Sequence, residues 1–318
     1  MDRSFERMCL PEIISNEDFT AHFQSEIWTD AARQICRRHK ISFSELRRGA
    51  SSDHIVFLLD ASLVLKIYRP FRNCFEREKK ALEFVGGKTG LKIPEIVFDG
   101  EFEGFNYLIQ TQIPGELMTR EIWFALSEKE QKRFVSTLAR ELKQIHELNP
   151  GAITCDWAEF VKDRAETFIE RQIAHGVNRK VLDALPEFIE QNLKLVPTRP
   201  TVFLHGDVHF GNLRAMKINN GWQISGLFDF ADSRRAFYEY DFLAVGVLMI
   251  QGQSAVQREF FRAYGYPEQN LNETMRRRLM MLTMLYETAD LRRYALRLKP
   301  EAVDFTLEEL ERSIWSFV

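Results

Sequence analysis

Cysteine is scarce in this sequence, with 4 among 318 residues. None of the four is close enough to another to form a C-x-x-C motif, so neither a zinc ribbon nor a thioredoxin-like redox site is available. So few cysteines fit a reducing compartment better than a disulfide-bonded scaffold. Long hydrophobic runs are also missing, since the longest, Phe242–Ile250, is far shorter than the ~20 residues that cross a bilayer. Residues 1–7 carry charges where a signal peptide needs an apolar run, so we expect a cytoplasmic protein without a membrane segment.

An excess of charge of one sign is absent as well. Lys plus Arg is 43 and Asp plus Glu is 46, which gives a formal net charge of −3. This near-balance argues against nucleic acid or an anionic membrane as a partner, because binders of both usually carry a basic excess. The hydrophobic fraction of 45% and the charged fraction of 28% are typical of a folded globular chain. The length predicts two domains, or one domain built from two lobes.

The two halves of the chain differ in pattern. Between residues 43 and 113, short β-type runs separated by turn residues predict five strands and one helix. After residue 115 apolar residues recur at helical spacing, and Ser127 and Thr306 each begin a capping-box pattern. We therefore expect a small β-rich lobe and a larger helical lobe, joined near residues 110–115. The predicted strands are Phe43–Arg47, His54–Leu59, Leu63–Tyr68, Glu95–Phe98 and Tyr107–Ile113, and the predicted helices are Phe71–Val85, Ser127–Leu148, Trp157–His175, Arg179–Leu195, Tyr238–Gln251, Ala255–Tyr264, Glu273–Leu298 and one beginning at Thr306.

A predicted hairpin interrupts the helical half and carries polar residues at its open end. Asn220-Gly221 is a strong signal for a two-residue type I′ turn between two β-type runs. With this turn Asn212 falls opposite Asp229, and opposed residues point to the same face about 5 Å apart. Such an all-oxygen pair suits a hard divalent cation. Taken alone, the pair has an alternative interpretation, in which Asn212 and Asp229 form a hydrogen bond that closes the end of the strands.

The segment before Asn212 adds a second carboxylate. It reads His205-Gly206-Asp207-Val208-His209-Phe210-Gly211-Asn212, and its two glycines indicate a loop. Because it follows an apolar strand, we expect Asp207 to emerge beside Asn212 and Asp229. Carboxylates this close repel unless a cation or hydrogen-bond donors offset the repulsion, which favours a functional metal site. The imidazoles of His205 and His209 suit zinc better than Mg²⁺.

A lysine interrupts one of the predicted strands. Lys66 lies within the apolar run Leu63–Tyr68 and, by alternation, shares a face with Val64 and Tyr68. A lysine inside a strand is costly unless it is paired or faces solvent. The residues alone leave both readings open.

Three of these segments resemble motifs of one enzyme superfamily. Residues 205–212 resemble the catalytic loop H-G-D-x-H-x-x-N of the aminoglycoside phosphotransferase and choline kinase superfamily, relatives of protein kinases. Residues 227–232 resemble its metal-binding segment, and residues 240–244 resemble the Y-D-L-A run that follows. The resemblance implies an α+β, protein-kinase-like bilobal fold. It divides the chain into an N-lobe at 1–110, a hinge at 111–116 and a helical C-lobe at 117–318.

The resemblance also implies roles in phosphoryl transfer. Asp207 would orient a substrate hydroxyl and finally accept its proton. A carboxylate with an ordinary pKa of about 3.9 is a weak base, but positioning and charge stabilisation dominate this chemistry. Asn212 and Asp229 would hold Mg²⁺ that bridges the phosphates of ATP or GTP. His205 and His209 would support the loop.

The N-lobe would supply the other nucleotide contacts. In the family, the lysine equivalent to Lys66 contacts the α- and β-phosphates and pairs with a helix glutamate, and an R-E pair before an apolar run picks Glu78 over Glu76. Ser51 and Ser52 lie in the loop that would cover the nucleotide. The Thr111 carbonyl and the Ile113 N–H would contact the adenine edge. Just before them stands Gln110, a polar residue where the family is often apolar, which leaves ATP and GTP as alternatives.

The resemblance favours an aminoglycoside-type antibiotic as the acceptor, and hence a resistance enzyme, and residues 168–172 and 229–264 resemble hygromycin phosphotransferases. A cationic sugar needs carboxylates in the cleft. The candidates are Asp232, Glu239, and Glu287 with Asp290, two residues expected on one face of a late helix. For each, an ion-paired or solvated surface carboxylate is an equal alternative. Arg234 and Arg235 could instead attract an anionic substrate. Asp241 is interpreted as a helix cap.

Other functions remain open at this stage. Choline, homoserine or another sugar are alternative acceptors. A non-catalytic nucleotide-binding pseudokinase is a second class, although it would usually lack one of the five motif residues. A metal-dependent hydrolase leaves Lys66 unexplained. A protein kinase is disfavoured by Gly206, which stands where its catalytic loop has arginine.

Overall fold

The computed structural model describes residues 9–49, 53–151, 153–219, 221–301 and 304–318. Backbone contacts divide the chain into two compact units. The first, called here the β unit, takes the described residues of 1–88 together with 92–114 and 227–232. The second, the helical unit, takes the described residues of 89–91, 115–226 and 233–318. In the described part of the chain, no helix has the length and apolar character needed to span a membrane.

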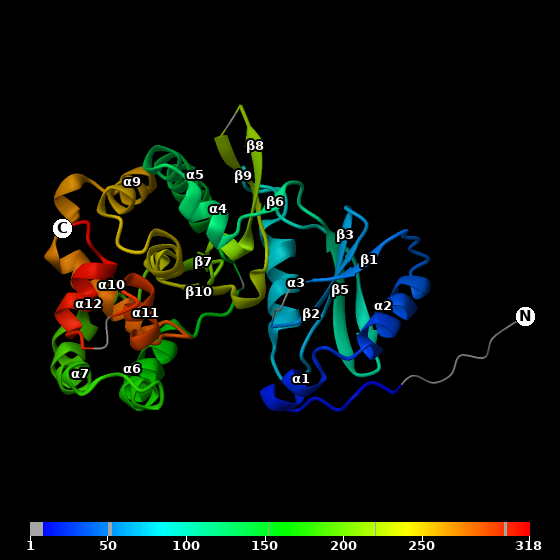
Figure 1. Ribbon diagram of the computed structural model, residues 1–318, viewed down its shortest axis with the longest axis horizontal. Coiled ribbons are helices and arrows are strands. Elements are labelled where there is room, and N and C mark those ends of the chain that lie inside the picture. The colour runs from blue at the N-terminus through cyan, green and yellow to red at the C-terminus, as the bar shows by residue number, and fades with distance from the viewer. Residues whose placement is uncertain (1–8, 50–52, 152, 220, 302–303) are drawn as a thin grey trace, which may run out of the picture. The chain divides into compact units, whose positions relative to one another are not determined.

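The β unit is built on a five-stranded antiparallel sheet with the strand order β1-β2-β3-β5-β4 (Figure 1). All five strands were predicted, with boundaries that differ by up to four residues. Two helices that precede the sheet, α1 and α2, were missed. The elements of the β unit are α1 (Asn16–His22), α2 (Ile27–Arg38), β1 (Leu46–Arg48), β2 (Ile55–Leu59), β3 (Leu63–Ile67), α3 (Cys74–Val85), β4 (Ile96–Phe102), β5 (Phe105–Thr111) and the 3₁₀ turn η3 (Phe230–Asp232).

The two faces of this sheet have different neighbours. Because side chains alternate along a strand, Phe57, Leu65 and Ile109 point to one face, where they form a buried core with Trp28 and Ile35 of α2. Helices α2 and α3 lie on opposite sides of the sheet (Figure 1). The face toward α3 therefore carries the alternate residues, and Lys66 is one of them.

The helical unit contains most of the helices predicted after residue 115. Helices α5 and α9 pack side by side, and α10 is largely buried beneath its neighbours. Two small sheets, β6-β8-β9 and β7-β10, accompany the helices. The elements are β6 (Glu116–Leu117), α4 (Arg120–Ala125), α5 (Glu128–Glu147), α6 (Trp157–Ala174), α7 (Arg179–Asn192), η1 (Leu193–Leu195), β7 (Val202–Leu204), η2 (Phe210–Asn212), β8 (Leu213–Ile218), β9 (Gly221–Leu227), β10 (Arg234–Ala236), η4 (Tyr238–Asp241), α8 (Phe242–Ala244), the π-helix η5 (Val245–Ile250), α9 (Ser254–Tyr264), η6 (Glu268–Asn270), α10 (Glu273–Leu285), α11 (Leu291–Leu298) and α12 (Leu307–Ile314).

The predicted helix Glu273–Leu298 is wrong, because it is broken into α10 and α11 at residues 286–290. Side chains of α6 bind the backbone of this break. Arg164 Nη2 donates to the carbonyls of Tyr286, at 2.7 Å, and Glu287, at 2.5 Å. Gln172 donates to the Ala289 carbonyl and accepts from the Leu291 N–H, each at 2.9 Å. These bonds satisfy backbone groups that an unbroken helix would pair within itself.

Two further predictions needed correction. The predicted helix Tyr238–Gln251 is a succession of 3₁₀, α and π turns, and Gln251 ends it in the left-handed conformation with φ 49°. In the hairpin, β8 ends at Ile218 and β9 already begins at Gly221. The connection is therefore residues 219 and 220, one position earlier than predicted, and residue 220 lies outside the described residues. Both predicted capping boxes, at Ser127 and at Thr306, are confirmed.

Candidate functional site

Lys66 is the centre of a buried ionic cluster in the β unit. It lies on β3, the middle strand of the sheet, and only 4% of its surface is exposed. Its Nζ lies 2.6 Å from Glu78 Oε2 on α3 and 2.6 Å from Asp229 Oδ1. The Tyr68 hydroxyl also donates to Glu78 Oε2, at 2.6 Å. The reading of Lys66 as an exposed strand lysine is thus wrong, and the ion pair with Glu78 that the resemblance implies is present.

The cluster keeps Lys66 charged. Burial acts to lower the pKa of Lys66, but the charges of Asp229 and Glu78 outweigh it and raise the pKa above its ordinary value. Glu78 is fully buried, and its Oε1 has no hydrogen-bond partner among the described residues. A buried cation held at one position by two carboxylates is preorganised to meet an anionic ligand.

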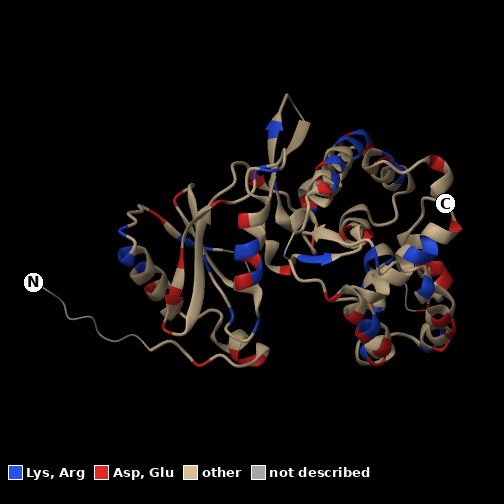
Figure 2. Cartoon of the chain, turned by 180° about the vertical axis from the view of Figure 1, so that it is seen from behind, with Lys and Arg blue, Asp and Glu red and all other residues tan. Residues whose placement is uncertain are grey.

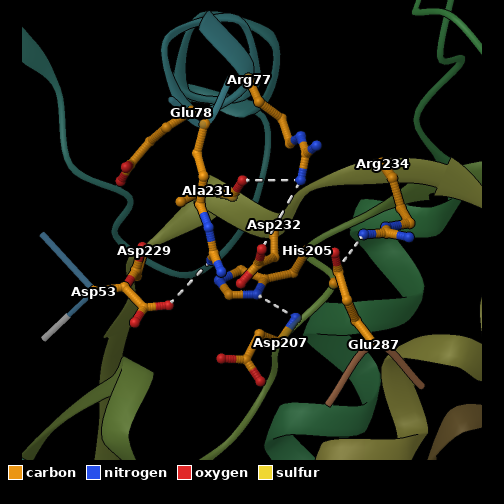
Figure 3. A network of polar contacts seen from close by, with 12 residues as sticks. Asp53, Arg77, Glu78, His205, Asp207, Asp229, Ala231, Asp232, Arg234 and Glu287 are labelled. Carbon is orange, nitrogen blue, oxygen red and sulfur yellow. Dashed lines mark hydrogen bonds and ion pairs between the residues drawn. The ribbon is translucent and has the colours of Figure 1, made fainter. Parts of the chain in front are cut away.

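Asp229 directly precedes the turn η3 and Asp232 ends it, and this turn belongs to the β unit. Asp229 has a φ of 65°, a left-handed conformation that aspartate tolerates better than most residues. Arg77 of α3 donates to the Ala231 carbonyl at 3.3 Å and lies 3.9 Å from Asp232 Oδ1 (Figure 3). Helix α3 therefore contributes Glu78 to the lysine cluster and Arg77 to the support of this turn.

Asp207 is the centre of a second cluster, in the helical unit. The loop after β7 places His209 Nε2 3.3 Å from Asp207 Oδ2. The Asp207 N–H donates to His205 Nδ1 at 3.2 Å (Figure 3). Asn212 Nδ2 donates to the Asp207 carbonyl at 2.9 Å and to Oδ2 at 3.2 Å. The Tyr286 hydroxyl donates to Asp207 Oδ1 at 2.5 Å, a contact that no motif indicated.

These contacts set the protonation state of Asp207. Burial acts to raise its pKa, but the hydrogen bond and charge of His209 and the hydrogen bond from Tyr286 outweigh burial, so the pKa is lower than usual. Asp207 is therefore ionised at neutral pH. Its Oδ1 and Oδ2 are held by donors from both sides, which fixes the direction of the carboxylate.

Asp241 anchors the loop that carries Asp207, and sequence reasoning missed this role. Its carboxylate accepts from the N–H of His205 at 3.0 Å and of Gly206 at 2.7 Å, and from His146 Nε2 at 3.0 Å. Asp241 was interpreted as a helix cap, but its side chain makes no capping hydrogen bond to α8. Asp241 lies in the segment Tyr240–Ala244, so the resemblance indicated this position but not the hydrogen bonds that its side chain makes.

The predicted metal ligands are an amide in the helical unit and a carboxylate in the β unit. Asn212 donates through Nδ2, which leaves Oδ1 as the atom that would face a cation. Oxygen donors from an amide and a carboxylate suit Mg²⁺, so the donor chemistry fits the predicted ion. No cluster of three or more His, Cys, Asp or Glu side chains suited to a metal occurs in the described part of the chain. The imidazoles of His205 and His209 are engaged by the loop itself.

The predicted adenine-edge contacts lie at the end of β5. The Thr111 N–H donates to the Glu95 carbonyl and its Oγ1 accepts from the Glu95 N–H, both at 2.9 Å. The Ile113 N–H has no hydrogen-bond partner within the described residues. Gln110 is buried, and its Oε1 likewise lacks a partner in that part of the chain. Ser51 and Ser52, the predicted phosphate contacts, lie outside the described residues.

The four carboxylates predicted to hold a cationic acceptor are already engaged elsewhere. Glu239 is fully buried and forms a bidentate pair with Arg278, at 2.6 and 2.7 Å, so it leaves the set of candidates. Glu287 pairs with Arg234 at 2.7 Å (Figure 3), and Asp232 lies beside Arg77. Asp290 caps α11 through the Arg293 N–H. Glu287 and Asp290 do not share a helix face, because the chain between them is not helical.

The chain has a kinase-like, bilobal α+β fold. One unit has a sheet with a buried lysine–glutamate pair, and the other has a loop that carries an aspartate. Solved structures share this fold. The GDP complex of aminoglycoside 2'-phosphotransferase-IIIa aligns at a TM-score of 0.70 and 15% identity over 92% of this chain and 99% of that one. A gentamicin complex of APH(2")-IIa aligns at 0.59 and 21% over 93% and 98%. Macrolide 2'-phosphotransferase MphH from Brachybacterium faecium aligns at 0.57 and 15% over 86% and 100%.

The family itself follows from the sequence match. The model of the phosphotransferase enzyme family matches residues 42–280, a span that contains the lysine cluster and the whole Asp207 cluster except Tyr286. The chain belongs to this family.

Proposed function

We propose that the protein is a nucleotide-dependent phosphotransferase that phosphorylates a hydroxyl group of a small molecule. The observation that carries the proposal is the buried Lys66, bound to both Glu78 and Asp229. Burying a cation costs free energy. This cost is explained if the ammonium group binds the phosphates of a nucleotide. Family membership supports the proposal, as do similar folds solved as complexes with GDP, ATP or ADP.

In this proposal the N-lobe, residues 1–110, and the hinge, residues 111–116, bind ATP or GTP. The ammonium of Lys66 neutralises phosphate charge, and the Ile113 N–H and Thr111 carbonyl contact the base. Ser51 and Ser52 stay predicted phosphate contacts. The C-lobe, residues 117–318, binds the acceptor.

The transfer itself needs few protein groups. The acceptor oxygen attacks the γ-phosphorus and forms a new P–O bond, while the bond from that phosphorus to the β–γ bridging oxygen breaks and the nucleoside diphosphate leaves. The hydroxyl proton passes to Asp207, which first orients the hydroxyl. Asn212 and Asp229 would hold Mg²⁺, which neutralises charge on the phosphates when it is bound. His209 and Tyr286 keep Asp207 directed and ionised.

The direct test is nucleotide consumption by the purified protein. We expect ATP or GTP to be converted to the diphosphate only when an accepted hydroxyl compound is present. The panel comprises aminoglycosides, the class that the resemblance favours, together with choline, homoserine, sugars and phosphorylated sugars. Nucleotide binding without turnover on any of them would favour a non-catalytic module, and metal-dependent activity without nucleotide would favour a hydrolase.

Replacing Tyr286 by phenylalanine is expected to move the acidic limb of the pH–kcat profile to higher pH. The Tyr286 hydroxyl donates to Asp207 and helps to lower the pKa of that carboxyl. Without the hydroxyl the pKa rises, so Asp207 becomes protonated at a higher pH. A hydrogen bond to a charged group corresponds to a displacement of about one pH unit. Initial rates at saturating substrates across the acidic range measure it.

Tyr107→Phe is the matched control, because it removes a hydroxyl that bonds to His39 in the β unit. Its acidic limb should coincide with that of the wild-type protein. A Tyr286→Phe limb that also coincides with it would show that Asp207 does not govern the acidic side of the profile.

Replacing Asp241 by asparagine is expected to lower kcat about 10- to 100-fold while the nucleotide Kd stays within about twofold. An amide has one acceptor oxygen, so it cannot hold both the His205 and Gly206 N–H groups, and the loop carrying Asp207 loses its fixed position. Misplacement by about 1 Å can reduce a rate on this scale. Steady-state kinetics with calorimetric nucleotide titration separate the two quantities.

Asp183→Asn, at an exposed position on α7, serves as the control and should leave both quantities unchanged. If Asp241→Asn weakened nucleotide binding as strongly as it lowered kcat, a general loss of structure would explain the result better than a displaced loop.

A further inference from the structure

The helical unit has a pocket rich in arginine that no sequence motif indicated. Its volume is about 570 Å³. It is formed by the start of α4, the end of α6 and the helix α11, segments far apart in the sequence. The lining residues are Arg120, His175, Asp290, Arg292, Arg293, Leu296 and Arg297.

The pocket carries an excess of positive charge. Four guanidinium groups face one carboxylate, and that carboxylate already caps α11 and lies 3.8 Å from His175. Across the described ranges of the chain, none of the four arginines forms an ion pair with the protein. Burial, and then the charges of Arg293 and Arg120, lower the pKa of Arg297, so these groups repel one another. Repulsion of this kind is relieved when an anion binds among them.

The pocket lies close along the chain to Tyr286, the residue that contacts Asp207. Tyr286 donates to Asp207, and Asp290, four residues later, lines the pocket. Four extended residues span at most about 14 Å. The segment between them is held in place by Arg164 and Gln172 of α6. One short segment of the helical unit therefore joins the residue that contacts Asp207 to the lining of the pocket.

The surroundings of this segment are also basic. Arg234 pairs with Glu287 and stacks over Phe160, with its guanidinium carbon 4.6 Å from the ring centre. Figure 2 shows β10, which carries Arg234 and Arg235, as a short blue strand. The carboxylates that a cationic sugar would need are engaged by arginine or by the backbone, as described above.

We propose that the arginine pocket binds the phosphate group of the acceptor, so that the substrate is a phosphorylated, hydroxyl-bearing small molecule. This inference rests on the proposed phosphotransferase function and names its acceptor class. Planar guanidinium groups bind phosphate oxygens in pairs, and a lining with four positive charges and one negative charge favours a dianion. The same lining repels a polycationic aminoglycoside.

The first experiment measures binding of inorganic phosphate by calorimetry, with Mg–ADP present so that the nucleotide site is filled. The pocket variant is Arg293→Gln/Arg297→Gln. The control is Lys162→Gln/Arg179→Gln, which removes two charges from exposed positions of the same unit. We expect the pocket variant to bind phosphate at least about tenfold more weakly than the wild-type and control proteins, because each charged hydrogen bond contributes about that factor. Equal binding by all three, or no binding by any, overturns the inference.

The second experiment compares acceptors by nucleotide consumption. We expect turnover with phosphorylated sugars and not with their neutral parents, and a KM for the phosphorylated acceptor at least about tenfold higher in the pocket variant. Turnover with aminoglycosides alone would overturn the inference and leave the phosphotransferase function intact. Phosphate binding that the pocket variant loses, without turnover on any acceptor, would support the anion site and contradict the proposed function.

Discussion

Asp207→Asn is expected to reduce kcat by about 10²- to 10⁴-fold, the contribution of a positioned general base. Asparagine keeps the size of the side chain and can still accept hydrogen bonds, but it has no negative charge and cannot take the hydroxyl proton. Nucleotide binding should change by less than about twofold, because in the proposal Asp207 contacts the acceptor and not the nucleotide. Turnover is measured with the acceptor identified by the screen, and nucleotide affinity is measured by calorimetry.

Asp183→Asn is again the control, since it makes the same chemical change at an exposed carboxylate of the helical unit. It should retain full turnover. If Asp207→Asn also retained full turnover while folded, Asp207 would not be the group that orients the hydroxyl, and the proposed assignment would be wrong.

Lys66→Met is expected to weaken nucleotide binding at least about tenfold and to lower the free energy of unfolding by about 3–5 kcal/mol. Both effects come from the loss of the contacts that the Lys66 ammonium makes. The ammonium that would face the phosphates is lost, and Glu78 becomes a fully buried carboxylate without its cation. Removing one partner of a buried ion pair leaves an uncompensated charge, which costs this amount. Calorimetric titration measures the affinity, and urea unfolding measures the stability.

The stability loss of Lys66→Met should depend on pH. Burial raises the pKa of Glu78, and removal of Lys66 raises it further. A carboxyl whose pKa is higher in the folded than in the unfolded chain binds more protons when folded, so lowering the pH favours the folded state. The variant should therefore be destabilised most at neutral pH, and the loss should shrink as the pH falls through the raised pKa of Glu78.

Two further variants separate these effects. Lys79→Met makes the same substitution on α3, where the lysine pairs with Asp99 near the surface, and it should alter stability by less than about 1 kcal/mol. Lys66→Met/Glu78→Gln removes the uncompensated charge, so it should recover stability without recovering nucleotide affinity. If the double variant also recovered affinity, Lys66 would act only as a structural partner of Glu78.

The parts of the site that could be predicted from the sequence depend on short-range patterns. Alternation along β3 places Lys66 on the face opposite the apolar core, whatever the rest of the chain does. The two capping boxes involve residues three positions apart, so their hydrogen bonds form within one turn of helix. The loop from His205 to Asn212 is similarly local, and its internal contacts to Asp207 follow from a single segment.

Other features were not predictable because they are made by side chains from distant segments. Arg164 and Gln172 bind the backbone at 286–290, more than a hundred residues away, and this allows the chain to leave a helix that its apolar pattern favours. The same break lets Tyr286 reach Asp207. Glu239 appeared available in the sequence, but its pairing with Arg278 buries it. No periodic pattern of apolar residues in the sequence indicates such contacts.

The sequence by itself determined the five strands of the β unit and most of the helices, because spacing and local hydrogen bonds fix them. It also indicated the residues that we propose for phosphoryl transfer. Tertiary structure alone decided how those residues are held and what surrounds them. It bound Lys66 to two carboxylates, anchored the loop of Asp207 through Asp241, and engaged Glu239 and Glu287 with arginines. It also gathered arginines from residues 120 to 297 into one pocket. Electrostatic environment depends on distance in space, and that distance is set only when the chain has folded.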